Sequence, residues 1–462
     1  MTLGAERKLG ERIARELYRD PDYIDDPVLV EYVQDIWQPL LKAARARGEL
    51  GPELDQRFAW QVLLGKDRSI NAFALPGGWL GLHSGLVAAT ASRDELASVL
   101  AHELSHVTQR HISRLMTQQS QQTPLMIAAM ILGALAASKN PQAGGAIMHG
   151  SQALAAQQQL NFSRDMEREA DRIGFGVMTA AGFEPQGFVT MFEKLQHAAR
   201  LNDNGNYPYL RTHPMTTERA ADMQSRQQLA SRAPVPSTLE HAMAAARARV
   251  ISYPGVDSLR AAVAEAEAAS FASLPRARQA GALYAAILAA TRLRDNATAA
   301  RLQARLDAVA GEDAAAQRLA RLLAAEVAIG QNDAARVLKL VDVDSRRRPD
   351  LLLSAQAQVQ SGKAAEAAQR LQTWVTNQPR DATAWQLLAS AYAAQGQQLR
   401  AIRAEAEARV ADLDYTAALD RFKAAQDLVR RGGAGGDHIE ASIVDTRARQ
   451  VESLVREQAL ER

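Results

Sequence analysis

The chain of 462 residues contains no cysteine. This absence excludes disulfide bonds, catalysis by a thiol and a metal site with cysteine ligands. It does not identify the compartment, because many periplasmic proteins also lack cysteine. Any metal in this protein must therefore be held by histidine and carboxylate side chains.

The sequence also lacks a strong excess of charge and a long apolar run. With 54 basic and 52 acidic side chains the formal net charge is only +2, so nucleic acid is not expected as a partner. The longest apolar stretch, residues 124–138, is shorter than the ~20 residues that span a bilayer. It fits a buried core helix, a helix lying on a membrane surface, or an apolar lid beside an active site.

Two histidines stand four residues apart in the stretch 102–106, which reads HELSH. In a helix, His102 and His106 then lie on one face, because four residues are slightly more than one turn. There they can hold a single tetrahedral metal ion, and Glu103 can take a proton from a water molecule. This HExxH pattern predicts a zinc site that hydrolyses peptide bonds.

The flanking sequence predicts a small sheet. Residues 57–65 and 69–75 have the composition of strands, residues 76–78 (PGG) predict a turn, and residues 79–82 predict a returning strand. The segment 69–75 either presents a free edge to which a peptide substrate can add as a further strand, or is an ordinary paired strand.

Two long helices are predicted around the motif. Ser92 and Glu95 form a capping box, and the helix that they open carries HExxH in its middle, where the backbone is rigid. A second amphipathic helix is predicted over residues 152–181 and ends at Gly182.

A catalytic zinc ion needs a third protein ligand. His111 lies nine residues after His102, about half a turn around the helix, and is therefore expected to face away. The extended metzincin pattern requires glycine at position 109 and histidine at position 112. The chain has Gln109 and Ile112 there, so that class is excluded.

A carboxylate from the second helix is the better candidate. Glu167 and Asp171 are four residues apart and share one face, whereas Glu169 is expected to point away from Glu167. One carboxylate can bind the metal while Asp171 supports a ligating imidazole from behind. The alternative is that these carboxylates lie on a solvent-exposed face of the helix and form ion pairs with neighbouring arginines.

The composition changes after residues 231–237, which we interpret as a boundary between domains 1–236 and 237–462. In the second domain Gly362 and Gly396 are 34 residues apart, a period typical of tetratricopeptide repeats. Residue types that suit this repeat occur at Ala367, Leu371, Pro379, Trp385, Leu388, Ala389 and Tyr392. An alanine-rich helical bundle without true repeats is the alternative.

Four ordered motifs carry a family resemblance. HELSH at 102–106 is followed by ExxAD at 167–171, with NAFALPGG at 71–78 upstream and THP at 212–214 downstream. Through these motifs the chain resembles the HtpX-type and prenyl-protease zinc peptidases. With repeats and without transmembrane helices, it is similar to the soluble periplasmic branch of that family.

The resemblance implies an α+β fold: a mainly helical, zincin-like protease domain with a small sheet, followed by an all-α tetratricopeptide-repeat solenoid. It implies one Zn²⁺ per chain, with Glu167 as the third ligand beside His102 and His106. It also implies a periplasmic location, outer-membrane protein clients and a docking partner in the barrel-assembly machinery. The polar opening residues do not read as a signal peptide, so a cytoplasmic peptidase is the alternative.

Several roles are open for His213 and Arg219. His213 precedes a proline, which favours an extended backbone. It is expected to stabilise an oxyanion, to support the site from behind, or to occupy the open coordination position and keep the enzyme latent; a purely structural histidine is the alternative. For Arg219 an oxyanion-stabilising role is possible, but a surface ion pair is expected.

The sequence therefore predicts a zinc endopeptidase with Glu103 as general base and a repeat domain whose concave surface binds protein segments. The competing hypothesis is a chaperone or assembly scaffold with a largely silent protease site, since exposed apolar surface can bind unfolded clients without cutting them. Contact of residues 124–138 with a membrane surface is compatible with either.

Overall fold

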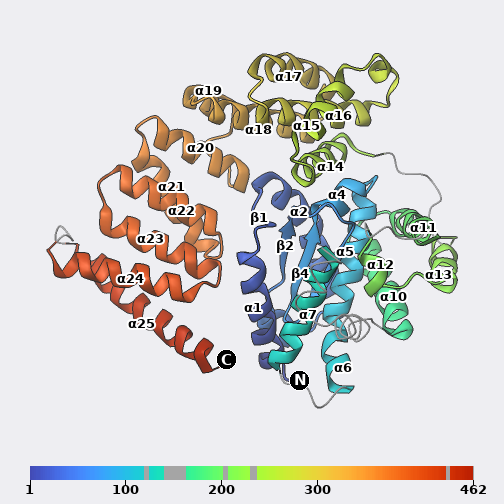
Figure 1. Ribbon diagram of the computed structural model, residues 1–462, viewed down its shortest axis with the longest axis horizontal. Helices are drawn as coiled ribbons and strands as arrows, with labels where there is room; N and C mark the ends of the chain where they lie inside the picture. The colour runs from blue at the N-terminus through green and yellow to red at the C-terminus, as the bar shows by residue number, and fades with distance from the viewer. Residues whose placement is uncertain (119–123, 140–162, 201–206, 229–236, 433–436, 461–462) are drawn as a thin grey trace. The chain divides into compact units, whose positions relative to one another are not determined.

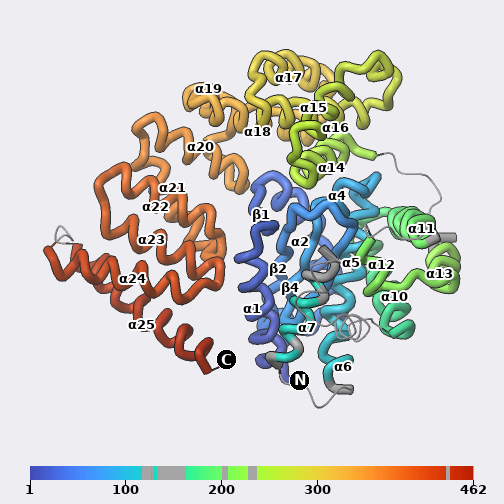
Figure 2. Tube along the Cα trace, viewed as in Figure 1, coloured from blue at the N-terminus to red at the C-terminus, as the bar shows by residue number. Residues whose placement is uncertain are grey.

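A computed structural model of the protein describes residues 1–118, 124–139, 163–200, 207–228, 237–432 and 437–460. The chain forms two compact units, residues 1–317 and residues 318–462, which are described separately. The boundary predicted after residue 236 is a different division of the chain and stays a prediction. Figures 1 and 2 show the course of the chain.

The elements of the first unit follow one another as α1 (Leu3–Arg19), β1 (Tyr23–Ile24), α2 (Pro27–Ala46), α3 (Pro52–Arg57), β2 (Gln61–Gly65), β3 (Ala72–Leu75), β4 (Trp79–His83), α4 (Ser84–Ala89), α5 (Arg93–Thr108), α6 (His111–Gln118), α7 (Pro124–Lys139), α10 (Arg164–Ala180), α11 (Gln186–Arg200), α12 (Tyr209–Thr212), α13 (Thr217–Gln228), α14 (Leu239–Ser252), α15 (Val256–Glu267), the 3₁₀ helix η1 (Ala269–Ser273), α16 (Arg276–Arg292) and α17 (Asn296–Ala310). The mainly helical α+β fold predicted for this region is confirmed.

Four strands form one sheet in the order β1-β2-β4-β3. The predicted hairpin is confirmed: β3 runs antiparallel to β4, with Ala72 opposite Leu82. β2 pairs with β4 in parallel, so β3 has a neighbour on one side only and lies at an edge of the sheet. The strand predicted over residues 57–65 begins later, at Gln61, because Pro52–Arg57 form α3.

The turn between β3 and β4 is held against α1. Gly77 and Gly78 both have positive φ, 74° and 83°, which glycine adopts without strain. On the facing helix, a Cβ atom at Gly10 would lie only 1.9 Å from the carbonyl oxygen of Pro76. The glycines thus let α1 approach the turn, which fixes the end of the edge strand.

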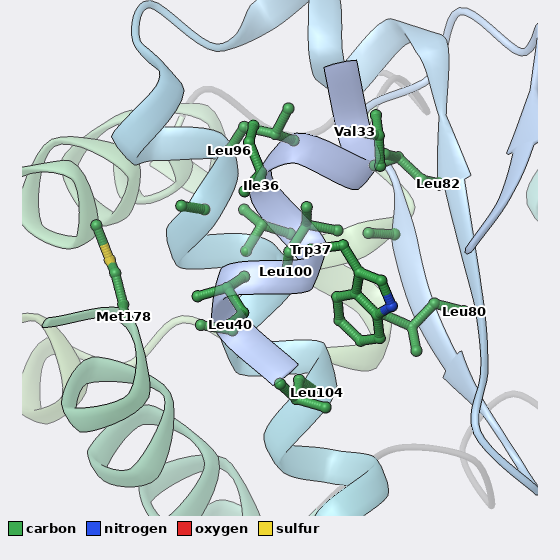
Figure 3. Packing of buried hydrophobic residues seen from close by; sticks show 14 of the residues in the cluster. Val33, Ile36, Trp37, Leu40, Leu80, Leu82, Leu96, Leu100, Leu104 and Met178 are labelled. Atoms are coloured by element: carbon green, nitrogen blue, oxygen red, sulfur yellow. The ribbon is translucent and has the colours of Figure 1, made fainter. Parts of the chain in front are cut away.

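The core of this unit lies between the sheet and helix α5. Figure 3 shows Trp37 and Leu40 of α2 close to Leu80 of β4 and to Leu100 of α5. All four side chains are almost completely buried. Burying a side chain of this size contributes about 1.5–3 kcal/mol, so this core holds α5 rigidly.

Helix α7 is the predicted apolar segment, and it packs near the opposite face of the sheet. Leu132 and Leu135 line a cavity together with Leu17 of α1 and Phe73 of β3. Met126 is 53% exposed. Among the described residues, no helix combines the length and the apolar character needed to cross a membrane.

Helix α14, which follows the predicted boundary, is tied to α2 by buried polar contacts. Arg247 donates two hydrogen bonds of 2.7 Å to the carboxylate of Asp26, the residue that caps the N-terminus of α2. Six residues earlier, His241 lies 2.7 Å from the hydroxyl of Tyr32. The segment 239–252 therefore completes the core of the first unit.

The second unit is helical throughout its described residues and consists of α18 (Ala314–Gly330), whose first residues belong to the first unit, α19 (Ala334–Leu340), α20 (Arg348–Gln360), α21 (Ala364–Asn377), α22 (Ala382–Ala394), α23 (Gln398–Ala411), α24 (Tyr415–Arg430) and α25 (His438–Leu460). Consecutive helices pack against each other, as in α20 with α21 and α22 with α23 (Figure 1). The predicted helical C-terminal region is confirmed.

The 34-residue period has a structural counterpart. Gly362 and Gly396 follow α20 and α22, with φ of 79° and 71°, a left-handed conformation in which glycine commonly ends helices. Between the helix pairs, Asp381 caps α22 and also accepts hydrogen bonds from Arg348 and Trp374. One carboxylate thereby joins successive pairs.

We predict that Arg247→Ala lowers the free energy of unfolding by about 3 kcal/mol, because it leaves the largely buried carboxylate of Asp26 without its charged partner. Chemical denaturation of the full chain measures the change. Arg249→Ala is the matched control on the same helix; it breaks a more exposed pair with Glu265 and should cost less than about 1 kcal/mol. Equal losses in the two variants would contradict the role of the Arg247–Asp26 pair.

Candidate metal centre

Helices α5 and α10 carry the two predicted motifs and pack closely against each other. Gly174 allows this approach, because a Cβ atom there would lie 3.1 Å from main-chain atoms of Ala101 and His102. Each helix is capped at its N-terminus by the serine that precedes it. Ser92 accepts a hydrogen bond from the amide of Glu95 at the start of α5, and Ser163 accepts one from the amide of Met166 at the start of α10. Ser92 caps α5 as predicted, but the returning bond of a capping box is shifted: the carboxylate of Glu95 accepts from the amide of Ala91, one residue before the cap, at 2.6 Å.

Four predicted site residues come together where α5 packs against α10. The ligand atoms of His102, His106, Glu167 and His213 all lie within 4.8 Å of one another. The Nε2 atoms of the two HExxH histidines are 2.9 Å apart. Glu167 Oε1 lies 3.4 Å from His106 Nε2 and 3.0 Å from His213 Nδ1. Each of the four side chains is at most 2% exposed.

The donor atoms of this cluster fit a bound cation. His102 Nδ1 lies 2.9 Å from a carboxylate oxygen of Asp171, so this nitrogen carries the proton and Nε2 presents a lone pair to the cluster. The neighbouring His106 Nε2 and the carboxylate of Glu167 direct further lone pairs to the same place. Such a convergence of acceptors is unfavourable without a positive charge between them. The arrangement suits one metal ion.

The catalytic candidate Glu103 lies beside the donor cluster rather than in it. Its Oε2 accepts a 2.9 Å hydrogen bond from the amide of Ala74 in edge strand β3. Its Oε1 lies 3.4 Å from Nε2 of His213. The strand edge and the carboxylate are therefore adjacent, as a peptidase that binds its substrate along β3 requires.

The pKa values of the two glutamates are shifted in opposite directions, although burial by itself raises both. Burial raises the pKa of Glu103, which suits a group that takes up a proton and releases it again. Burial acts in the same sense on Glu167, but its neighbours His213, His102 and Arg219 favour the negative charge and hold its pKa well below the usual value. Glu167 is thus kept as a carboxylate, the form that binds a cation.

His213 reaches the cluster from a different segment, just after the short helix α12. Its ring stacks on Tyr209, with centroids 4.5 Å apart. Tyr209 is buried and its pKa is raised, first by burial and then by the nearby carboxylate of Glu103. The sequence gives no signal for Tyr209, because its stacking on His213 depends on how the short helix α12 packs.

Asp171 lies behind His102, where the sequence placed it, and Arg219 fixes it there. Arg219 donates to both oxygens of Asp171, at 2.6 and 2.8 Å. Its Nη1 also lies 2.8 Å from Glu167 Oε2. The expectation of a surface ion pair for Arg219 is wrong: this side chain is 3% exposed and neutralises the carboxylates of the site.

The expectation that His111 faces away is also wrong. His111 Nδ1 lies 2.9 Å from Nδ1 of His106, and its Nε2 lies 3.0 Å from Glu169. The helical geometry assumed for it does not apply, since α5 ends at Thr108 and α6 starts at His111 itself. Glu169 does point away from the donor cluster. It is linked to His106 only through His111, whose ring lies between them.

Comparisons with known proteins agree with this geometry. Residues 31–227 match the model of peptidase family M48, and residues 339–410 match that of the bacterial transcriptional activator domain. The beta-barrel assembly-enhancing protease of Escherichia coli (strain K12) is 32% identical over 456 residues, 97% of this chain and 89% of the relative. The protein of that name from Yersinia pestis is 29% identical over 98% of this chain and 90% of its own length.

A more distant relative shares only the first part of the chain. The mitochondrial metalloendopeptidase OMA1 of Saccharomyces cerevisiae is 28% identical over 197 residues, 41% of this chain and 54% of the relative. The fold and the histidine–glutamate cluster define a metalloprotease. Together with these similarities, they show that the chain belongs to peptidase family M48.

We predict that the protein holds one divalent metal ion per chain and that Glu167→Gln weakens its binding by more than the roughly 10–100-fold typical of residues outside the ligand set. Elemental analysis after dialysis against a chelator series measures this. Glu218→Gln removes an exposed carboxylate from the same unit and is the control. Equal metal retention by Glu167→Gln and the wild type would exclude Glu167 as a ligand.

Proposed function

We propose that the protein is a zinc-dependent endopeptidase in which His102, His106 and Glu167 hold the metal. The observation that carries this proposal is the spacing of the donor atoms. A tetrahedral zinc ion with bonds of about 2.0–2.1 Å has its ligand atoms about 3.3 Å apart. In this structure the corresponding separations run from 2.9 to 3.5 Å. Imidazole and carboxylate are also the ligand types that zinc takes in hydrolases.

Bound zinc would polarise the scissile carbonyl and lower the pKa of a water molecule far below that of bulk water, towards about 7. The chain supplies the proton transfer: Glu103 takes the proton of the water on its carboxylate and passes it to the leaving amine. The amide of Ala74 orients this carboxylate by donating to Oε2. A substrate strand added to the free edge of β3 would place its backbone beside Glu103.

The resting enzyme is latent in this proposal, because His213 supplies a fourth donor. Its Nδ1 lies 3.4 Å from His102 Nε2 and 3.0 Å from Glu167 Oε1. A catalytic zinc site keeps one position open for water or substrate, whereas a site with four protein ligands is closed. His213 must therefore leave the cluster before a peptide is cut. The geometry favours this role over that of an oxyanion donor.

The helices of the second unit would recognise client proteins. We propose that they are tetratricopeptide repeats with a concave binding surface, supported by the 34-residue period and by the helix pairs. The resemblance to beta-barrel assembly-enhancing proteases supports a periplasmic role in the assembly and quality control of outer-membrane proteins, with the barrel-assembly machinery as partner. The apolar helix α7, with Met126 exposed, would provide membrane-surface contact.

One observation favours a second function, that of a chaperone or assembly scaffold with a largely silent protease site. His213 brings a fourth ligand atom within 4.8 Å of the other three, and with all four bound no position of a tetrahedral ion would stay open. A protein in this state would bind clients without cleaving them. The two functions are compatible if a client or partner displaces His213.

We predict that Glu103→Gln keeps the metal but lowers proteolysis by roughly 10²–10⁴-fold, because the amide cannot accept the proton. Digestion of casein with and without chelator, together with metal analysis, measures both properties. Glu218→Gln serves as the control for a lost surface charge. Retained cleavage by Glu103→Gln would exclude it as the base. Full complementation by this variant in cells lacking the protein would favour the scaffold function.

We predict that His213→Ala raises proteolysis by about tenfold or more, since an open state that is a minor population becomes the dominant one. The rate of peptide cleavage, measured with saturating zinc, tests this. His197→Ala changes an exposed histidine of the same unit and is the control. A lower rate in His213→Ala would instead indicate that the ring stabilises the oxyanion. Unchanged cleavage and metal affinity would exclude both roles.

A further inference from the structure

We propose that His111 and Glu169 are positioning residues for the metal ligand His106. In this proposal they hold its ring in one tautomer and one orientation through a hydrogen-bonded chain that ends at the protein surface. The inference rests on the proposed metal centre and adds to it a support that the motifs HExxH and ExxAD do not contain.

The backbone after α5 is folded so that His111 returns to the site. Helix α5 ends at Thr108, and Arg110 adopts a left-handed conformation with φ of 53°. A non-glycine residue in this conformation reverses the chain at a local energetic cost, so the surrounding structure must hold it. His111 then begins α6 with its ring next to His106, instead of half a turn away from it.

Contacts from α1 hold this reversal. The guanidinium of Arg110 donates to one carboxylate oxygen of Glu6, at 2.9 and 2.8 Å, and to the carbonyl of Met1 at 2.7 Å. It also donates to the hydroxyl of Ser113 at 3.2 Å. The carboxylate of Glu6 is buried, whereas the Arg110 side chain is 32% exposed. These contacts therefore stabilise the left-handed turn at Arg110.

The hydrogen bonds form a chain in which each ring donates to the next group. His106 presents Nε2 to the donor cluster, so its proton must lie on Nδ1. That N–H donates to His111 Nδ1 at 2.9 Å, which requires the proton of His111 to be on Nε2. His111 Nε2 in turn donates to Glu169 Oε2 at 3.0 Å. Arg114 completes the chain by donating to Glu169 at 2.7 Å.

The other histidine of the motif, His102, is also held by a carboxylate and an arginine. His102 contacts Asp171 directly, and Arg219 binds that carboxylate. At His106 the carboxylate is Glu169, with His111 interposed. Outer partners of this kind orient a ligating imidazole and raise its basicity. Helix α10 thus serves both histidines, in addition to supplying Glu167 itself.

The alternative is that Glu169 and Arg114 form an ordinary surface pair and that His111 is a packing residue. The burial of His111 argues against it: this polar ring is 0% exposed, and its two nitrogens face His106 and Glu169. A packing role would be filled by an apolar residue of similar volume. Measurements on substituted proteins can separate the two possibilities.

The test measures zinc affinity of the full-length protein by competition with a chromophoric chelator, and thermal unfolding of the metal-free form. His111→Phe keeps the ring volume but removes both hydrogen bonds, and should weaken zinc binding roughly 10–100-fold. His111→Asn places an acceptor oxygen where Nδ1 stood, and should stay within about threefold of wild type. Glu169→Gln should fall between them. The exposed His197→Phe is the control and should leave the affinity unchanged.

Rescue by asparagine is the result that a packing role does not produce. Wild-type zinc affinity in a folded His111→Phe protein would overturn the proposal, as would a loss of metal-free stability with unchanged affinity. If His111→Phe does not fold, the decision passes to the zinc release rates of His111→Asn and Glu169→Gln. An unchanged rate in Glu169→Gln then overturns the role of the chain. Zinc binding without cleavage by either the wild type or His213→Ala would refute the proposed protease function but leave this comparison intact.

Discussion

The convergence of unshared electron pairs at one buried point is the constraint on which the rest of this domain depends. Two imidazole nitrogens 2.9 Å apart and a carboxylate face one another in a region that water does not reach. Without a cation this arrangement is strongly unfavourable. The chain nevertheless maintains it, because the two helices that carry these groups are fixed by a large apolar core.

The polar groups around this point follow from the same constraint. A buried carboxylate such as Asp171 needs a charged partner, and Arg219 supplies it while also contacting Glu167. On the other side, Glu169 has Arg114. One helix, α10, thereby carries the proposed ligand Glu167 and the two carboxylates that contact the histidine network, at alternate positions. This concentration of function explains why a single helix packs so closely against α5.

Much of the fold and of the site could be predicted where a helix or strand keeps its regular geometry from its first to its last residue. The four-residue spacing of His102 and His106 worked because both lie inside α5. The same reasoning placed Glu167 and Asp171 on one face of α10. The strand pairing of β3 with β4 also followed from local signals, namely strand-like composition and a glycine-containing turn.

The failures occurred where tertiary contacts override the local pattern. His111 was placed by continuing a helix that ends three residues earlier, and no glycine marks the left-handed residue Arg110. Arg219 was assigned to the surface because most arginines are there, and its buried partners come from another helix. Tyr209 escaped notice because its stacking on His213 depends on how α12 docks. Such features require knowledge of which segments meet.

X-ray absorption spectroscopy of the zinc-loaded protein tests the central claim most directly. The account predicts three imidazole nitrogens and one carboxylate oxygen at about 2.0–2.2 Å in the wild type, and two imidazoles in His213→Ala. A first shell made mainly of water or carboxylate oxygens, with fewer than two imidazoles, would contradict it.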